Sequence, residues 1–254
     1  MAQEIDWVSQ IPAPRGADNQ SNAIDDQNNI YLSGQFSGIV DFDLDTSVFN
    51  IGCITCRGSY VAKYSSTRKL QYANQIQNLG FFSLNFCQDM HVNELGEVLI
   101  MGWFKDSIDA DPGPQKIRLE SNGYEDIYLI KFDSIGDLLW AKSWGGKDGD
   151  VAYQLEVDQQ ENIYLSGYFA DSIDFNPSGA SGKLTAQNGE EGFLLKLDSL
   201  GKFEWVIQTH SNLNTQFNNM SLDVDNNVVV AGSFSGTLRL DSIHLQTNTS
   251  KEPL

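Results

Sequence analysis

Basic residues are scarce in this chain. Lys and Arg together number 16 against 34 Asp and Glu, which gives a formal net charge of −18 at neutral pH. A field of that sign repels a polyphosphate backbone and an anionic membrane surface. We therefore expect no nucleic acid among the partners of this protein.

Long apolar runs are also missing. No stretch approaches the roughly 20 apolar residues that cross a bilayer as a helix, so the sequence predicts no membrane insertion. The N-terminus, Met1-Ala2-Gln3-Glu4, lacks the basic and apolar regions of a signal peptide, although Ala-Gln is a common junction after signal-peptide cleavage. The sequence favours an extracellular or cell-surface protein whose signal peptide has been removed. A cytosolic protein that begins at its natural Met is the alternative.

Cysteine is rare, with 3 in 254 residues, so no disulfide framework holds the fold together. Cys53 and Cys56 have the spacing of a redox pair or of half a zinc site, but they fall in a predicted loop between two strands, without a βαβ unit. We expect a local disulfide between them, with free thiols as the alternative. Cys87 falls in a predicted strand, where burial as a small apolar residue is usual.

Internal repetition is what the chain has in abundance. A β-branched segment that ends in Gly recurs four times, and an apolar residue stands ten positions before each glycine, across a polar turn. This pattern predicts a β-hairpin in every copy. The recurring glycines, at steps of 68, 65 and 65 residues, are Gly34, Gly102, Gly167 and Gly232.

Two further strands complete each predicted unit. The third carries a recurring lysine, which we expect to pair with a neighbouring carboxylate, and the fourth carries a recurring aromatic residue. The third strands are Tyr60–Tyr64, Tyr128–Phe132 and Phe193–Leu197, with Lys63, Lys131 and Lys196. The fourth-strand aromatics are Trp7, Tyr72, Trp140 and Trp205.

A four-stranded antiparallel unit that repeats without helices or linkers is the blade of a propeller. The sequence therefore predicts an all-β fold, a β-propeller with a repeat of about 65 residues, in three full copies plus an incomplete fourth. We expect one domain over 1–254. Its copies cover approximately 11–76, 77–144, 145–209 and 210–254, with 1–10 as a terminal blade strand.

The fourth copy is predicted to lack its third strand, which would begin near position 258. A ring closed through the termini would then keep an unsatisfied edge. We expect an open arc, or a section of a longer propeller that is part of a longer multi-domain chain.

Several segments resemble a known repeat. Gly145 to Tyr153, Leu155 to Asp158 and Asn162 to Gly167 resemble the bacterial SBBP-type β-propeller repeat, and Phe169 to Pro177 and Phe193 to Gly201 resemble its longer variant in secreted proteins of Bacteroidetes. The resemblance covers nearly the whole chain. It implies a secreted or surface protein and a propeller fold, but it implies no particular activity.

Acidic residues follow the second strand of each copy, and oxygen ligands that converge from a short loop are what Ca²⁺ requires. The alternating pattern Asp41-Phe42-Asp43-Leu44-Asp45 equally predicts a half-buried strand with a solvated face, which is the reading that we favour. Calcium is the one cofactor that the sequence suggests. Its candidate ligands are Asp41, Asp43, Asp45, Asp109, Asp111, Asp174 and Asn176.

No catalytic constellation emerges from the sequence. The histidines are scattered, no nucleophile elbow is present, and the carboxylates recur at matching positions, so no unique pair is nominated. We predict a non-enzymatic secreted or cell-surface module that binds a protein or a glycan or serves for structural display. A propeller-type glycan lyase or hydrolase and a calcium-stabilised repeat array are the alternatives.

Overall fold

The computed structural model describes residues 8–13 and 15–247, with the backbone alone for 53–56. Every regular element in these ranges is a β-strand, and all strand pairs are antiparallel. The predicted all-β class is therefore confirmed. No helix of the described residues could span a lipid bilayer.

The strands form units that repeat along the chain. Each of the first three units is a meander in which the first strand pairs with the second, the second with the third and the third with the fourth. The first unit consists of β1 (Ala17–Ile24), β2 (Ile30–Asp41), β3 (Asn50–Tyr64) and β4 (Leu70–Asn78). The second consists of β5 (Leu84–Val92), β6 (Val98–Lys105), β9 (Asp126–Phe132) and β10 (Leu138–Trp144). The third consists of β11 (Val151–Val157), β12 (Ile163–Phe169), β15 (Glu191–Leu197) and β16 (Phe203–Gln208).

A final hairpin repeats the first two strands alone, as β18 (Thr215–Leu222) and β19 (Val228–Phe234). Short inserted hairpins follow the second strand of the later units. They are β7 (Ser107–Asp109) with β8 (Arg118–Glu120), β13 (Ser172–Asp174) with β14 (Lys183–Thr185), and β20 (Thr237–Leu240) with β21 (Ile243–Gln246). Two of these inserts reach back to the preceding unit, since β7 pairs with β4 and β20 pairs with β17 (His210–Ser211). Backbone hydrogen bonds therefore link consecutive units.

The recurring glycines are explained by a bulge in the first strand of every unit. The register shifts opposite each glycine, as between Cys87 and Asp89 opposite Gly102. A Cβ atom at Gly102 would lie 1.9 Å from the carbonyl oxygen of Phe86, and the other three glycines face an equivalent carbonyl at 1.8 to 2.0 Å. Only glycine fits this close approach of two backbones.

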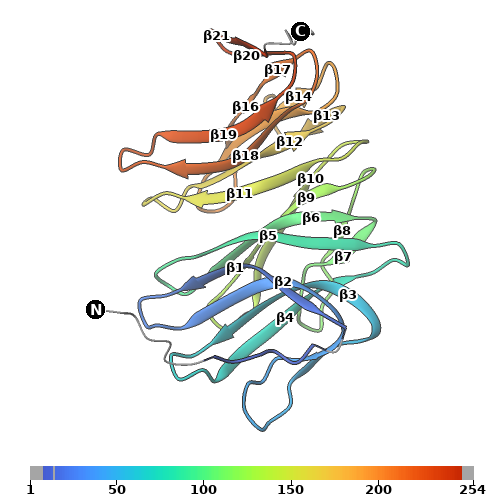
Figure 1. Cartoon of the computed structure of the whole chain (residues 1–254), viewed down its shortest axis with the longest axis vertical. Coiled ribbons are helices and arrows are strands. Elements are labelled where there is room, and N and C mark those ends of the chain that lie inside the picture. The colour runs from blue at the N-terminus through green and yellow to red at the C-terminus, as the bar shows by residue number, and fades with distance from the viewer. Residues whose placement is uncertain (1–7, 14, 248–254) are drawn as a thin grey trace, which may run out of the picture.

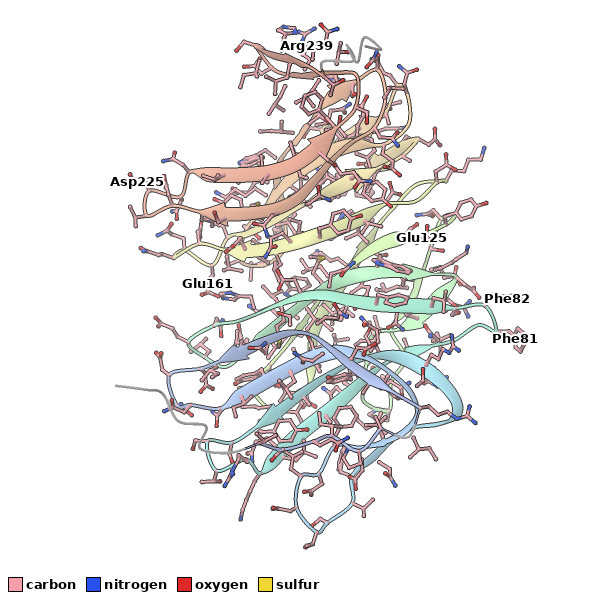
Figure 2. All side chains as sticks on the ribbon, in the orientation of Figure 1. Phe81, Phe82, Glu125, Glu161, Asp225 and Arg239 are labelled. Atoms are coloured by element: carbon pink, nitrogen blue, oxygen red, sulfur yellow. The ribbon has the colours of Figure 1, made fainter. Side chains whose placement is uncertain are left out.

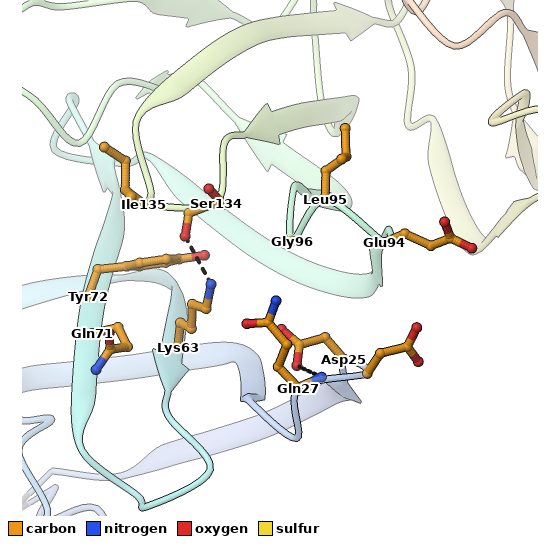
Figure 3. A pocket seen from close by; sticks show the side chains of 11 residues that line it. Asp25, Gln27, Lys63, Gln71, Tyr72, Glu94, Leu95, Gly96, Ser134 and Ile135 are labelled. Atoms are coloured by element: carbon orange, nitrogen blue, oxygen red, sulfur yellow. Dashed lines mark hydrogen bonds between the residues drawn. The ribbon is translucent and has the colours of Figure 1, made fainter.

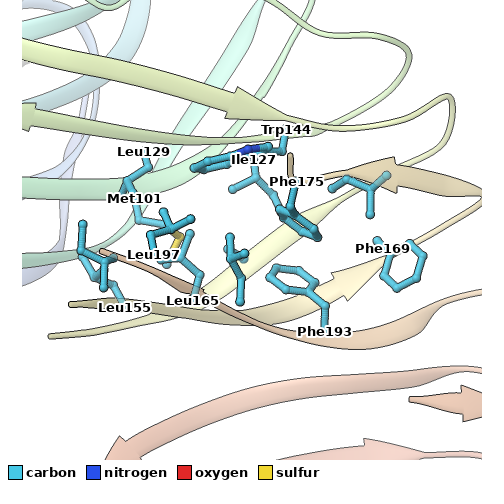
Figure 4. Packing of buried hydrophobic residues seen from close by; sticks show 14 of the residues in the cluster. Met101, Ile127, Leu129, Trp144, Leu155, Leu165, Phe169, Phe175, Phe193 and Leu197 are labelled. Carbon is cyan, nitrogen blue, oxygen red and sulfur yellow. The ribbon is translucent and has the colours of Figure 1, made fainter. Parts of the chain in front are cut away.

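The sheets stack face to face along the long axis of the molecule, from the first unit to the final hairpin (Figure 1). Their apolar side chains form cores between consecutive units. Between the second and third units, Met101 and Trp144 pack with Leu165, Phe175 and Phe193 (Figure 4). The described ends of the chain lie at opposite ends of the stack, and within the described residues no strand of the first sheet pairs with the final hairpin. The arrangement is open.

Two local predictions were wrong. Residues 53–56 belong to β3 and not to a loop, because β2 and β3 extend past Gly34 as one long ribbon that bulges between Gly52 and Arg57. Residues 42–45 form an irregular segment and not a strand, because the carboxylates of Asp41 and Asp43 accept hydrogen bonds from backbone N–H groups two residues ahead. Trp7 lies outside the described residues.

Candidate functional site

The carboxylates proposed as calcium ligands are engaged with the backbone of their own loops. The Asp41 Oδ1 atom accepts from the Phe49 N–H at 2.8 Å, and the Asp109 Oδ1 atom accepts from the Ile117 N–H at 3.0 Å. The Asp111 Oδ1 atom accepts from the Gly113 N–H at 2.7 Å. These bonds fold each acidic loop on itself.

The third acidic loop follows the same pattern, with the Asn176 N–H donating to Asp174 Oδ1 at 2.9 Å. The three loops belong to different units, and no three His, Cys, Asp or Glu side chains gather as metal ligands within the described residues. Calcium binding by Asp41, Asp43, Asp45, Asp109, Asp111, Asp174 and Asn176 stays a prediction.

The cysteine predictions have different outcomes. The side chains of Cys53 and Cys56 lie outside the described residues, so their disulfide also stays a prediction. Cys87 is fully buried, as predicted, and burial raises the pKa of its thiol to about 12. A thiol with this pKa is not a nucleophile at neutral pH.

The recurring lysines join turns and strands. Lys131 pairs with Glu97 at 2.7 Å and Lys196 pairs with Glu204 at 3.0 Å, which confirms the predicted carboxylate partners for these two. Lys63 instead donates to the backbone carbonyl of Ser134 at 3.0 Å, across a polar cleft of about 350 Å³ between turns of the first and second units (Figure 3). Lys63 therefore holds two units together.

A ladder of polar side chains also crosses the stack. Asp89 accepts hydrogen bonds from the Ser21 hydroxyl at 3.0 Å and from the Gln154 amide at 2.8 Å, which stand at the equivalent positions of the neighbouring units. The N–H groups of Met90 and Leu155 donate to the same carboxylate. Burial raises the pKa of Asp89, but both of its oxygens are occupied. The ladder therefore stabilises the stack.

Two buried carboxylates meet between the second and third units. Burial raises the pKa of Asp126 to about 6 and that of Asp150 to about 8. Raised carboxyl pKa values are typical of catalytic acids. Both residues are fully buried, however, so no substrate reaches them. The protonation of Asp126 and Asp150 therefore depends on pH, but the two residues do not form an accessible site.

The accessible site lies on the first unit, where two clefts meet along β4. One cleft, of about 650 Å³, is lined by Arg57, Asn78 and the loop 79–83. The other, of about 380 Å³, is lined by Phe49 and the acidic loop around Asp111. Gln75 and Gln77 line both clefts. They stand two residues apart on β4 and therefore share one face of the sheet.

Two phenylalanines mark the end of the first cleft. Phe81 is 96% exposed and Phe82 is 77% exposed, and their rings contact each other edge to face with centroids 5.1 Å apart. Both project from the loop 79–83 away from the body of the molecule (Figure 2). Nearby along β5, the ring of Phe86 stacks on Trp103 at 4.4 Å.

Asp109 and Asp111 were nominated from the sequence, as calcium ligands and not for this groove. The glutamines and phenylalanines of the groove were not nominated, but one signal could have found the loop. In the sequence, the aromatic residue of each fourth strand precedes the ladder residue of the next unit. This separation is 17 residues from Tyr72 to Asp89. It is 14 residues from Trp140 to Gln154, and again from Trp205 to Asn219. The loop 79–83, which carries Phe81 and Phe82, therefore contains a three-residue insertion that the corresponding loops of the later units lack.

Comparison with known proteins indicates a β-rich repeat protein. No protein-family model matches the chain. An uncharacterized WD repeat-containing protein of Acanthamoeba polyphaga mimivirus is 30% identical over 122 residues, which are 47% of this chain and 9% of that protein. The crystal structure of a protein of unknown function from Bacteroides caccae aligns over 78% of this chain and 84% of its own, with a TM-score of 0.27 and 12% identity.

Proposed function

We propose that this chain is a non-enzymatic binding module of the SBBP-type β-propeller kind, which acts outside the cell or at its surface and captures a protein or glycan through the 79–83 loop. The observation that carries the proposal is the inserted loop itself. It breaks the symmetry of the repeats and places Phe81 and Phe82 in solvent beside a cleft of about 650 Å³.

Exposed aromatic side chains of this kind are unfavourable in the unbound protein. Each Phe forgoes roughly 1.5–3 kcal/mol by remaining in water, and a structural loop has no need of two. Aromatic residues at the mouth of a cleft are the usual anchors of a bound ligand. The repeated units then serve as a rigid support for the loop.

Catalysis has less support from the same residues. Asp126 and Asp150, whose pKa values burial raises to about 6 and about 8, are buried. Asp41 and Asp109 accept hydrogen bonds from their own loops. A general acid must reach the atom that it protonates.

The test is a binding screen on a glycan array and on a peptide library displayed on phage. We expect reproducible ligands whose affinity falls at least tenfold in the double variant Phe81→Ala and Phe82→Ala. Leu200→Ala is the matched control, because Leu200 is also an exposed apolar residue, 63% accessible, in a turn of the third unit. Ligands that bind the double variant as well as the parent, or turnover of a hydrolase substrate, would contradict the proposal.

A further inference from the structure

We infer that the groove along β4 is a binding site for a neutral oligosaccharide. The inference rests on the binding function proposed above, and it names the ligand and the residues that select it. Four observations carry it: the extent of the groove, an amide without a protein partner, a missing carboxylate, and the chemistry of the lining.

The groove is long enough for a chain of sugars. Lining residues on β4 run from Ala73 in one cleft to Asn78 in the other, a distance of roughly 16 Å for an extended strand. Phe49 stands in one cleft, and Phe81 and Phe82 stand in the other. Aromatic rings therefore flank both ends.

Gln75, in the middle of the groove, has an amide that no protein group holds. Its Nε2 atom is buried and has no hydrogen-bond partner among the described residues. A buried unpaired donor of this kind destabilises the unbound protein. The amide can turn about its last side-chain torsion and donate to a ligand oxygen in either cleft.

The equivalent amide of the third unit is fully engaged. Gln208 occupies the position of Gln75, because each pairs with the first aromatic residue of its third strand. The Gln208 Nε2 atom donates to Glu191 at 2.8 Å and to the Thr185 carbonyl at 3.2 Å.

The first unit lacks that carboxylate. The residue that pairs with the phenylalanine of the second strand is Asp126 in the second unit, Glu191 in the third and Gly58 in the first. A Cβ atom at Gly58 would come within 2.6 Å of the Ile76 carbonyl oxygen and 3.4 Å of Gln75 Nε2. Glycine at this position removes the partner that Gln75 would otherwise have.

The lining chemistry matches a polyol. Amide and carboxyl side chains supply both donors and acceptors for hydroxyl groups, and the flanking rings offer apolar faces to the C–H side of a sugar. Those side chains are Asn50, Gln75, Gln77, Asp111 and Gln115. A chain with a net charge of −18 disfavours uronic and sulfated polymers, so the ligand is neutral.

The experiment is calorimetric titration of the whole chain with cello-, manno-, malto- and chito-oligosaccharides of one to six sugars. For the series that binds, we expect the affinity to rise at least tenfold from the disaccharide to the tetrasaccharide. Gln75→Leu should lower the tetrasaccharide affinity about tenfold. Phe49→Ala should weaken the tetrasaccharide but leave the disaccharide unchanged.

Gln208→Leu is the matched control, since it removes the same amide from a unit without the groove, and its affinity should equal that of the parent. Circular dichroism and a melting curve establish that each variant is folded. If saccharide binding requires Phe81 and Phe82 but depends neither on the length of the oligosaccharide nor on Gln75, the groove is not the binding site. The binding function proposed for the 79–83 loop would then still hold. Peptides that bind through Phe81 and Phe82, with no saccharide bound, would lead to the same conclusion. If no ligand binds at all, both proposals fall.

Discussion

The first and third units share one fold but treat the same buried position in opposite ways. In the third unit, Glu191 and Gln208 satisfy each other, and the position is closed. In the first unit, Gly58 replaces the carboxylate, Gln75 has no partner among the described residues, and two clefts meet beside it. The third unit therefore closes this position with its own side chains, whereas the first unit leaves an amide available to the oligosaccharide that we propose.

The second unit adds a third solution at this position, in which a carboxylate is buried against another carboxylate. The Asp126 Oδ2 atom accepts from the backbone of Asn122, while its Oδ1 atom has no partner within the described residues. Asp150, at the start of β11, accepts from Gly146 and Ala170. Units that look equivalent in sequence therefore respond differently to pH, truncation and ligand.

The largest expected effect is a loss of stability as the pH rises. The folded pKa of Asp150, about 8, lies above the unfolded value of 3.8. The contribution of protonated Asp150 to the free energy of unfolding is therefore complete below pH ~4. It is lost as the pH rises through about 8, and the free energy of unfolding falls by about 1.4 kcal/mol per pH unit. Asp126 acts in the same direction up to about pH 6.

Urea denaturation at pH 5, 6.5 and 8 measures this loss. We expect the free energy of unfolding to fall by roughly 4 kcal/mol between pH 5 and 8. The variant Asp150→Asn should flatten the slope, whereas Asp225→Asn, at an exposed turn of the final hairpin, should leave it unchanged. A slope that is the same in the parent and in Asp150→Asn would show that the junction of the second and third units is not the sensor.

The next effect is the removal of Glu191. Its carboxylate is fully buried and accepts from the Gln187 N–H and the Gln208 amide. Glu191→Ala removes the acceptor of the Gln187 N–H and one of the two acceptors of the Gln208 amide. It should destabilise the fold by about 3 kcal/mol, or roughly 6 to 12 °C in melting temperature. Glu120→Ala, which breaks the exposed pair with Arg118, should change stability by less than about 1 kcal/mol. Equal losses in the two variants would remove the distinction between a closed junction and the surface.

A smaller loss is expected at the ladder. Asp89→Ala removes the acceptor shared by Ser21, Gln154 and Leu155, and should destabilise the stack by about 2 kcal/mol. Asn219→Ala, at the exposed end of the ladder, should cost less than about 0.5 kcal/mol. A double-mutant cycle between Asp89 and Gln154 should give a coupling energy above about 0.5 kcal/mol. Strict additivity would mean that the ladder does not join the units.

The sequence predicted the strands well because the repeats report local chemistry. Gly34, Gly102, Gly167 and Gly232 recur where a bulge brings two backbones together, and the apolar residues between them follow the period of a strand. The strand predicted over Asp41–Asp45 was wrong, because side-chain hydrogen bonds to the backbone override an alternating pattern. Residues 53–56 were predicted as a loop because the sequence does not show that β2 and β3 continue to pair beyond Gly34.

The groove was missed for a different reason. Repetition draws attention to positions that are alike, whereas Gly58 differs from its counterparts and Phe81 lacks any. Gln75 is the same residue type as Gln208 and differs only in its partners. Their meaning depends on which residue lies across the sheet, as Gly58 lies near the Gln75 amide. Pairing of this kind follows from the register of the strands, which the sequence does not state.

The smallest effect tests the comparison most directly, because one substitution is made at the same position of two units. Gln208→Leu removes the donor that occupies the buried Glu191 carboxylate and should destabilise the protein by about 1 kcal/mol. Gln75→Leu removes a buried amide that has no partner among the described residues, so it should raise the stability by about 1 kcal/mol. Both are measured by urea denaturation at pH 6.5. A loss at Gln75 as large as that at Gln208 would mean that the first unit uses its amide to fold, and the groove would then have no residue kept for a ligand.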